Sequence, residues 1–536
     1  MSYPLLLRGV LERARQFSPG KEIVTRVPDG LQRTTYGEMA SRANALGHAL
    51  LRLGVQRGDR VGTLGWNHFR HLELYFAVPC LGAVLHTINL RLFQDQVAYI
   101  IQHAEDRVLF LDPDVVPLLE RLHGQIPSVR DFVIMCDRES MPATTLPGAV
   151  CYEDLLDGGS RDYVFPDDLD EDLPAAMCYT SATTGNPKGV QYSHRMLFLH
   201  TMAKCLTDTI AVSERDTILP VVPMFHVNAW GLPWAAAFAG AKLVLPGARP
   251  DSKALAELIQ QEGVTLAAGV PTVWMGVLDE LRARSYDFST IRALEVGGAA
   301  VPRALMEAYD QLGITVMHAY GMTEAAPLTH VGRLRSSADD RSTEERYRLR
   351  VKQGMLAHGL EMRLVGEHGE NVPWDGESLG ELALRGPWVA TEYYRDARTA
   401  ETFREGWYYT GDVGSVDAEG YLQLADRTKD LVKSGGEWIS SVDIENHLMA
   451  HASVQEAAVI AVPHARWQER PVACVALRSQ SAPVSEEDLK IFLSERIVGW
   501  WMPDRVVFID EVPKTSVGKF DKKVLRARFK DLLGGA

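Results

Sequence analysis

The segment from Tyr179 to Val190, YTSATTGNPKGV, brings hydroxyl, glycine and lysine residues together in one short stretch. Its threonines and serine offer hydroxyl groups, its glycines leave backbone N–H groups accessible, and Lys188 adds a mobile positive charge. These groups suit a polyphosphate that is held and then released. It is not a Walker A loop, because Gly-x4-Gly-Lys-Ser/Thr does not occur in the chain. On composition alone, the alternative is a polar surface turn.

Four later segments carry residues that complement such a loop. They are GGAAVP at 297–302, YGMTE at 320–324, YYTGD at 408–412 and PKTSVGK at 513–519. The first lets backbone approach a flat ligand closely, the second combines an aromatic ring, a hydroxyl and a carboxylate, and the third ends in an acid. Each one alone predicts little, since a Thr-Glu pair is usually a solvated turn and a late Gly-Lys is usually on the surface.

In this order and spacing the segments resemble the adenylate-forming superfamily of acyl-CoA synthetases, adenylation domains and luciferases, over nearly all 536 residues. The stretches PMFHVNAWG at 223–231 and DRTKDLVKSGGEWIS at 426–440 are most similar to fatty acyl-CoA synthetases of the medium- and long-chain type. The resemblance implies an α/β fold with a large N-terminal domain (1–428) and a small mobile α+β C-terminal domain (429–536). The large domain would hold two parallel α/β subdomains and a β-barrel-like subdomain.

The resemblance also implies an ATP site with Mg²⁺, in which carboxylate and nucleotide form an acyl-adenylate. Glu324 would bind Mg²⁺, and Thr323 would contact the α-phosphate. The residues implied for the nucleotide are Thr180, Ser181, Thr183, Thr184 and Lys188 at the β- and γ-phosphates, Tyr320 with Gly298, Ala299 and Ala300 at adenine, Asp412 and Arg427 at the ribose, and Gly185, Gly321 and Met322 elsewhere in the ATP site. Members of the family usually carry glycine where this chain has Ala182, so we expect altered ATP kinetics.

Two reactions would share this site. Lys519 would bridge the attacking carboxylate and the α-phosphate and stabilise charge that develops in the transition state. Rotation about a hinge at Lys429 would then withdraw Lys519 and bring up the CoA-side residues Lys433, Ser434, Gly435, Gly436, Glu437 and Trp438. The glycine pair suits a narrow pantetheine tunnel, because it presents backbone without side chains.

An aromatic and apolar cluster is predicted to line the acyl pocket: Phe225, Val227, Trp230 and Trp234. Trp230 would act as a gate, and His226 would lie on the carboxylate side. Ordinary core is the alternative, since tryptophan is commonly buried. No basic residue interrupts the cluster in the sequence, which favours an aliphatic monocarboxylate over a dicarboxylate or an amino acid.

The bulk composition limits the class of protein. A chain of 536 residues is too long for one core. Its formal charge of −14 argues against a nucleic-acid partner, and its six scattered cysteines suit free thiols in a reducing cytoplasm. The first apolar stretch contains Arg8, Glu12, Arg13 and Arg15, which is untypical of a signal peptide. The interrupted segment 229–247 predicts a buried helix and strand rather than a membrane span.

The elements that must position these residues alternate between helix and strand. Tyr36–Leu53 and Leu72–Leu81 have helical periodicity, whereas segments 60–64, 108–111, 242–245, 266–268 and 294–296 read as buried strands. This alternation implies parallel sheets covered by helices. Segments 361–365, 380–385 and 421–425 predict an antiparallel unit. A helix, two strands and a helix follow at 442–449, 454–462, 472–477 and 486–497, and 333–350 is predicted to be a surface loop.

Three readings of the function stay open at this stage. The acid is a medium- to long-chain fatty acid, or it is a short-chain or sulfur-containing acid such as methylmercaptopropionate. The acyl group is passed to CoA, or to a carrier protein or an amine. A non-catalytic binding protein is disfavoured, because Lys519, Glu324 and Asp412 are all present. A homodimer is expected by resemblance alone.

Overall fold

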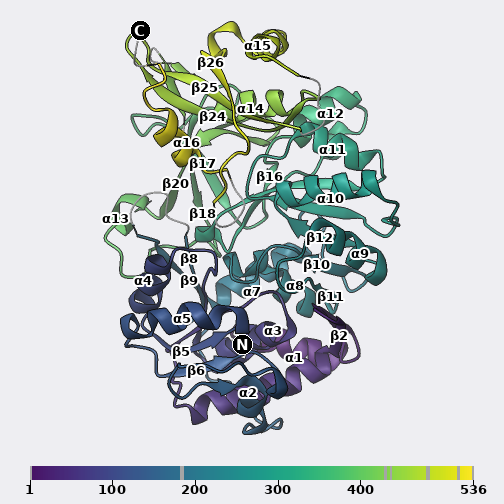
Figure 1. Cartoon of the computed structure of the whole chain (residues 1–536), viewed down its shortest axis with the longest axis vertical. Coiled ribbons are helices and arrows are strands. Elements are labelled where there is room, and N and C mark those ends of the chain that lie inside the picture. Colours follow the sequence, from purple (N-terminus) through teal and green to yellow (C-terminus); the bar gives the residue numbers. More distant parts are fainter. Residues whose placement is uncertain are drawn as a thin grey trace.

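The computed structural model describes residues 3–180, 186–427, 431–434, 437–478, 483–515 and 520–533. The chain forms two helix-covered sheets, an antiparallel half-barrel and a C-terminal sheet (Figure 1). The purple and blue first sheet and its helices lie in the lower part of the view, teal helices of the second sheet reach the upper right, and the yellow-green C-terminal unit lies at the top. The predicted fold class is therefore confirmed.

The first sheet has seven strands in the order β7-β6-β5-β3-β4-β8-β9, and all neighbours are parallel except β8 and β9. The strands are β3 (Arg60–Leu64), β4 (Val84–Thr87), β5 (Asp106–Leu111), β6 (Asp131–Ile134), β7 (Val150–Cys151), β8 (Pro174–Tyr179) and β9 (Gly189–Ser193). One face is covered by α4 (Gln94–Ala104) and α5 (Val116–Leu122). The strands predicted at 60–64 and 108–111 are confirmed as β3 and β5 of this sheet. Apolar runs rich in branched residues are typical of buried parallel strands.

The second sheet has nine strands in the order β16-β15-β14-β13-β12-β10-β11-β1-β2. They are β1 (Glu22–Val27), β2 (Gly30–Thr35), β10 (Thr217–Pro220), β11 (Lys242–Leu245), β12 (Leu266–Gly269), β13 (Ala293–Gly297), β14 (Thr315–Gly321), β15 (Leu328–Val331) and β16 (Met355–Leu356). Its outer face packs against α9 (Ser252–Glu262), α10 (Pro271–Ala283) and α11 (Arg303–Asp310). The three strands predicted at 242–245, 266–268 and 294–296 are confirmed as β11, β12 and β13.

A shared core lies between these two sheets. Apolar side chains from both sheets meet in one buried cluster with residues from several helices. The helices are α1 (Leu7–Phe17), α2 (Tyr36–Arg52), α3 (Phe69–Cys80), α7 (His194–Cys205) and α8 (Leu232–Ala239). A small helix, α6 (Tyr152–Asp157), packs beside β7 and adds Tyr152 and Leu156 to the same cluster. Both predicted helices in this region are therefore confirmed, with α3 beginning three residues earlier than expected.

The half-barrel consists of antiparallel strands that carry β20 at their centre. Its elements are β17 (Glu361–Val365), β18 (Gly380–Arg385), α13 (Thr399–Thr402), β19 (Phe403–Arg404), β20 (Trp407–Val416) and β21 (Leu422–Arg427). β20 pairs with β18, β19 and β21, so Asp412 stands opposite Arg427 in the register. This unit confirms the antiparallel prediction for residues 361–425.

The C-terminal unit is a second mixed sheet with helices on its faces. It contains β22 (Val432–Ser434), β23 (Glu437–Ile439), α14 (Ser441–Met449), β24 (Val454–His464), β25 (Gln468–Leu477), α15 (Glu486–Ser494), β26 (Arg505–Phe508) and α16 (Lys522–Phe529). β24 and β25 are antiparallel, whereas β26 runs parallel to β25. The chain leaves the half-barrel at Arg427 and enters this sheet at Val432, so the change of sheet falls across Lys429, which lies outside the described residues.

The prediction of a surface loop at 333–350 is wrong, because helix α12 spans Thr343–Arg350. Ser342 accepts a hydrogen bond from the Glu345 N–H, and the Glu345 carboxylate accepts one from the Ser342 N–H at 2.9 Å. This capping box satisfies two donors at the start of the helix. The sequence S-T-E-E carries that signal, and the charged composition of the segment obscured it.

All six cysteines lie within the described residues and none forms a disulfide. Of the helices in those same residues, none is both long and apolar enough to cross a membrane.

Candidate active site

The base of the predicted phosphate loop is a hairpin between β8 and β9. The Thr180 N–H donates to the Lys188 carbonyl at 2.9 Å, and the Lys188 N–H donates to the Thr180 hydroxyl at 3.3 Å. Ser181, Ala182, Thr183, Thr184 and Gly185 lie outside the described residues. The structure therefore describes both ends of the loop, which enter and leave at the carboxyl edge of a parallel sheet, where ligands of α/β proteins usually bind.

The hydroxyl of Tyr393 joins two predicted site residues that are far apart in sequence. Lys188 Nζ donates to this hydroxyl at 2.7 Å, and the hydroxyl donates to Glu324 Oε1 at 2.7 Å. The ammonium also lies 3.9 Å from the centroid of the Tyr393 ring. Burial and the Glu324 charge raise the pKa of Tyr393, so it stays protonated and keeps donating at neutral pH. Sequence reasoning missed Tyr393, since a tyrosine in the segment EYYRD carries no signal by itself.

Two hydrogen bonds from other parts of the chain hold the YGMTE segment in place. Tyr192 donates from its hydroxyl to the Thr323 carbonyl at 2.6 Å, and the Ala390 N–H donates to the Glu324 carbonyl at 2.7 Å. Thr323 and Glu324 open a short 3-10 turn, η5 (Thr323–Ala325), and both are buried. A β-carbon on Gly321 would stand 2.1 Å from the Pro327 carbonyl oxygen, so only glycine fits there.

Tyr320 and Asp412 are also brought together. The Tyr320 hydroxyl donates to Asp412 Oδ2, and Asp412 is 9% exposed. Gly298 has φ +82° and follows β13, with half-buried Ala299 and Ala300 after it. Met322, half-buried, donates its N–H to the Pro327 carbonyl. Arg427 neighbours Asp412 through the β20–β21 pairing, although its side chain is outside the description.

Glu324 offers a buried carboxylate to a metal. Among the residues that the structure describes, no group of three or more His, Cys, Asp or Glu side chains could hold an ion. Mg²⁺ commonly binds through one or two carboxylates, with substrate phosphates and water completing the octahedron. Glu324 therefore fits a Mg²⁺ ion that arrives with a nucleotide.

A cavity of about 10 Å³ lies at the carboxyl ends of β4 and β8. Thr180, Phe225 and His226 line it, together with His86, so three predicted site residues meet here. His86 Nδ1 lies 2.8 Å from Asp106 Oδ2, and both side chains are fully buried. Such a volume accommodates roughly one water molecule.

The turn that carries Trp230 has an unusual backbone. Val227, Asn228, Ala229 and Trp230 all have positive φ, between 36° and 55°, within η4 (Val227–Gly231). Left-handed conformations cost roughly 1–2 kcal/mol per non-glycine residue, and such strain concentrates at functional sites. Asn228 secures the turn, because its amide donates to the Thr87 hydroxyl at 3.4 Å.

The remaining acyl-pocket candidates differ in their surroundings. The ring of Trp230 packs over Gly297, where a β-carbon would lie 3.5 Å from its edge. Trp234 is fully buried, and its indole N–H donates to the Tyr75 carbonyl at 3.2 Å within the core between α3 and α8. Phe225 contacts the edge of Trp66 at 5.8 Å between ring centroids.

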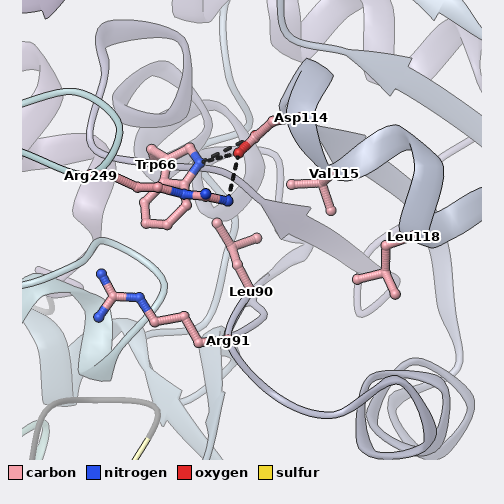
Figure 2. Close-up of a pocket in the computed structure, with 7 residues that line it drawn as sticks. All are labelled: Trp66, Leu90, Arg91, Asp114, Val115, Leu118 and Arg249. Carbon is pink, nitrogen blue, oxygen red and sulfur yellow. Dashed lines mark hydrogen bonds and ion pairs between the residues drawn. The ribbon is translucent and has the colours of Figure 1, made fainter.

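Beyond Phe225 lies a larger cleft of about 310 Å³ (Figure 2). Arg91 and Arg249 place their guanidinium carbons 5.6 and 5.4 Å from the centroid of the Trp66 ring. Asp114 accepts hydrogen bonds from the Trp66 indole N–H at 3.2 Å and from Arg249 at 3.3 Å. Burial and the Arg249 charge lower the pKa of Arg91. The sequence did not predict this cleft, because its residues come from four separate segments.

The C-terminal candidates are described only in part. Ser434 is buried and accepts from Arg470, and the Lys433 ammonium lies 3.6 Å from Glu367 of the half-barrel. Glu437 and Trp438 form part of β23, and their side chains are outside the description. Gly435, Gly436, Lys429 and Lys519 lie outside the described residues.

Comparisons with known proteins identify the class. The model of the AMP-binding enzyme family matches residues 11–394, and the model of the AMP-binding enzyme C-terminal domain matches residues 443–519. A long-chain-fatty-acid–CoA ligase of Thermus thermophilus is 47% identical over 539 residues, covering 100% of this chain and 98% of that protein. The chain therefore belongs to the adenylate-forming, AMP-binding enzyme family.

Two further relatives and one solved structure agree. A medium-chain-fatty-acid–CoA ligase of Ectopseudomonas oleovorans is 41% identical, covering 99% of this chain and 97% of that protein. A 3-methylmercaptopropionyl-CoA ligase of Ruegeria lacuscaerulensis is 42% identical, covering 100% and 99%. The crystal structure of the anthranilate CoA ligase AuaEII with anthranoyl-AMP superposes with a TM-score of 0.88 at 26% identity, covering 100% and 99%. The predicted class of an AMP-forming acid–thiol ligase, with ATP and CoA as co-substrates, is confirmed.

Proposed function

We propose that this protein is a fatty acid–CoA ligase for medium- to long-chain aliphatic acids, which converts ATP, acid and CoA to acyl-CoA, AMP and pyrophosphate. The observation that carries the proposal is the junction at Tyr393, where the phosphate-loop lysine meets the carboxylate of the YGMTE segment. The identities of 47% and 41% to fatty-acid–CoA ligases over whole chains support the choice of acid.

The adenylation step joins an anionic acid to an anionic nucleotide, so its catalysis is mainly electrostatic. Lys188 and the hydroxyls of the loop hold the β- and γ-phosphates, and Thr323 contacts the α-phosphate. Tyr320 lies beside adenine, and Asp412 and Arg427 hold the ribose. When bound at Glu324, Mg²⁺ neutralises phosphate charge.

His226 and Lys519 act at the reacting carboxylate. His226 lies at the cavity beside Thr180, which supports a position on the acid side of the phosphate loop. Lys519 bridges the carboxylate and the α-phosphate during adenylate formation and is not needed once the adenylate exists. Residues 1–428 form the adenylation domain and residues 429–536 the mobile domain, with the hinge at Lys429.

The second step needs a thiol to reach the acyl-adenylate. Rotation about Lys429 removes Lys519 and brings the stretch Lys433–Trp438 to the CoA side. The change from half-barrel to C-terminal sheet between Arg427 and Val432 supports this position for the hinge. Phe225, Val227, Trp230 and Trp234 surround the path of the acid, with Trp230 as the gate.

A Lys519→Ala variant tests this division of labour. We expect adenylate formation, measured as acid-dependent pyrophosphate release, to be lost, whereas thioester formation from preformed acyl-AMP is largely retained. An equal loss in both half-reactions would reject the proposal for Lys519. Acid-dependent pyrophosphate release without CoA consumption would reject CoA as the acceptor in favour of a carrier or an amine.

A sulfur-containing short acid is the second candidate substrate, favoured by the 42% identity to a 3-methylmercaptopropionyl-CoA ligase. A panel of acids that includes 3-methylmercaptopropionate, octanoate and tetradecanoate separates the two by their kcat/KM values. We also propose a homodimer, which sedimentation velocity of the purified protein tests directly.

A further inference from the structure

Lys204 and Glu295 form an ion pair deep in the core between the two large sheets. Their side chains are 0% and 1% exposed, and Lys204 Nζ donates to Glu295 Oε1. Burial lowers the pKa of Lys204, and the Glu295 carboxylate opposes this shift. Taking two charges out of water costs about as much as their attraction returns, so a buried pair is weak evidence for a stabilising role. Another reason for its presence is therefore required.

The surroundings of the pair leave polar groups without partners. Glu295 Oε2, His200 Nδ1 and the Thr201 hydroxyl are buried, and none makes a hydrogen bond among the residues described. His200 Nε2 accepts from the Leu328 N–H at 3.2 Å, and burial with the Lys204 charge lowers the pKa of His200 well below its usual range. The ring is therefore neutral, and its Nδ1 carries a hydrogen that it does not donate to any described group.

This polar cluster lies directly behind the proposed gate. Gly297, which supports the Trp230 ring, and Glu295 lie on the same face of β13, since side chains alternate along a strand. Two residues of strand span roughly 7 Å. Gly231, the residue after Trp230, lies against His200, because a β-carbon on Gly231 would stand 2.7 Å from His200 Nδ1. Lys204 lies one turn further along α7.

We propose that the Lys204–Glu295 pair closes the far end of the acyl pocket and restricts the enzyme to medium-chain and shorter acids. The proposal rests on the function proposed above and narrows its substrate class. The acyl chain of a substrate that passes Trp230 along β13 would meet the Lys204 ammonium and the Glu295 carboxylate within about two strand residues. Both side chains are already buried and fill this space, so a longer alkyl chain would have to displace the paired groups, to which it offers no hydrogen bond.

The sequence could not indicate this boundary. No basic residue interrupts the aromatic cluster at 225–234, yet the fold brings Lys204 of α7 to Glu295 of β13, two residues along the strand from Gly297, on which the Trp230 ring packs. A sequence segment without basic residues therefore does not show that the pocket lacks them.

The test measures kcat/KM for pyrophosphate release with butanoate, octanoate and tetradecanoate. In the wild-type protein we expect kcat/KM for tetradecanoate to be at least about tenfold lower than that for octanoate, a difference within the usual range for discrimination by pocket size. Lys204→Ala combined with Glu295→Val removes both charges together and opens space, so kcat/KM for tetradecanoate should rise above its wild-type value and come within a few-fold of that for octanoate. Lys204→Met combined with Glu295→Leu keeps most of the side-chain volume, so kcat/KM for tetradecanoate should stay low.

Met202→Ala is the matched control, because Met202 lies on the same helix and is 43% exposed; its length profile should equal that of the wild type. A wild-type profile that is flat to tetradecanoate overturns the inference, even if both double variants fail to fold. An unchanged profile in the folded Ala/Val variant also overturns it. If the wild type releases pyrophosphate with none of the three acids, the proposed function falls, and the inference falls with it.

Discussion

Replacing Tyr393 by phenylalanine tests the junction on which the proposed function depends. The change deletes one hydroxyl and keeps the ring, which packs 3.9 Å from the Lys188 ammonium. Two hydrogen bonds are lost, each 2.7 Å long and each to a charged group: one from Lys188 and one to Glu324. A hydrogen bond to a charged group contributes about 1.5–3 kcal/mol. If one of these bonds orients Glu324 in the ATP complex, kcat/KM for ATP falls roughly ten- to hundredfold.

The assay is steady-state pyrophosphate release with ATP varied at a saturating fatty acid, together with a thermal melt. The acid profile should not change, because Tyr393 contacts the phosphate-loop lysine and the YGMTE carboxylate rather than the aromatic cluster. Tyr394→Phe is the control: its N–H donates to the Gly189 carbonyl, and this bond survives the substitution. Unchanged ATP kinetics in a Tyr393→Phe variant that melts at lower temperature would refute the reasoning and leave Tyr393 a purely structural residue.

Three further predictions follow from other parts of the site and the fold. Gly321→Ala places a β-carbon 2.1 Å from the Pro327 carbonyl, so we expect about 1–3 kcal/mol of destabilisation and weaker ATP use; a stable variant with normal ATP kinetics would contradict this. Ala182→Gly should change ATP affinity or turnover and leave acid selectivity alone, as the same pyrophosphate assay would show. Burial raises the pKa of Glu445 to about 7, despite Lys522 at 2.8 Å. A carboxyl whose pKa is raised in the fold stabilises it below the unfolded value near 4.5 and loses this contribution as pH rises towards 7. Glu445→Gln should therefore flatten the fall in stability over that range in denaturant melts, and an unaltered pH dependence would contradict the assignment.

Much of the fold was readable because its elements carry strong local patterns. The strand Lys242–Leu245 is an apolar run next to a turn, and the structure reproduces its bounds as β11. Helix α12 was missed because its stabilising features are a capping box and ion pairs to α11, such as Arg303 with Glu344 at 2.8 Å. Charged composition suggested a loop, whereas capping and tertiary contacts favoured a helix.

Part of the candidate active site was likewise visible in the sequence, and part was not. The motif residues at Thr180, Lys188, Tyr320, Glu324 and Asp412 are visible in sequence, because hydroxyls, glycines and charges in fixed order are rare by chance. Their mutual contacts are not visible, because they depend on which strands lie side by side.

The sequence by itself determined the class of protein, since the chemistry of adenylate formation requires particular side chains and these are concentrated in short segments. Tertiary structure alone decided that Tyr393 connects Lys188 with Glu324, and that Lys204 meets Glu295 behind Trp230. These partners are separated by 69 to 205 residues along the chain. Contacts of that kind follow from sheet order and helix packing, which no local pattern of residues encodes.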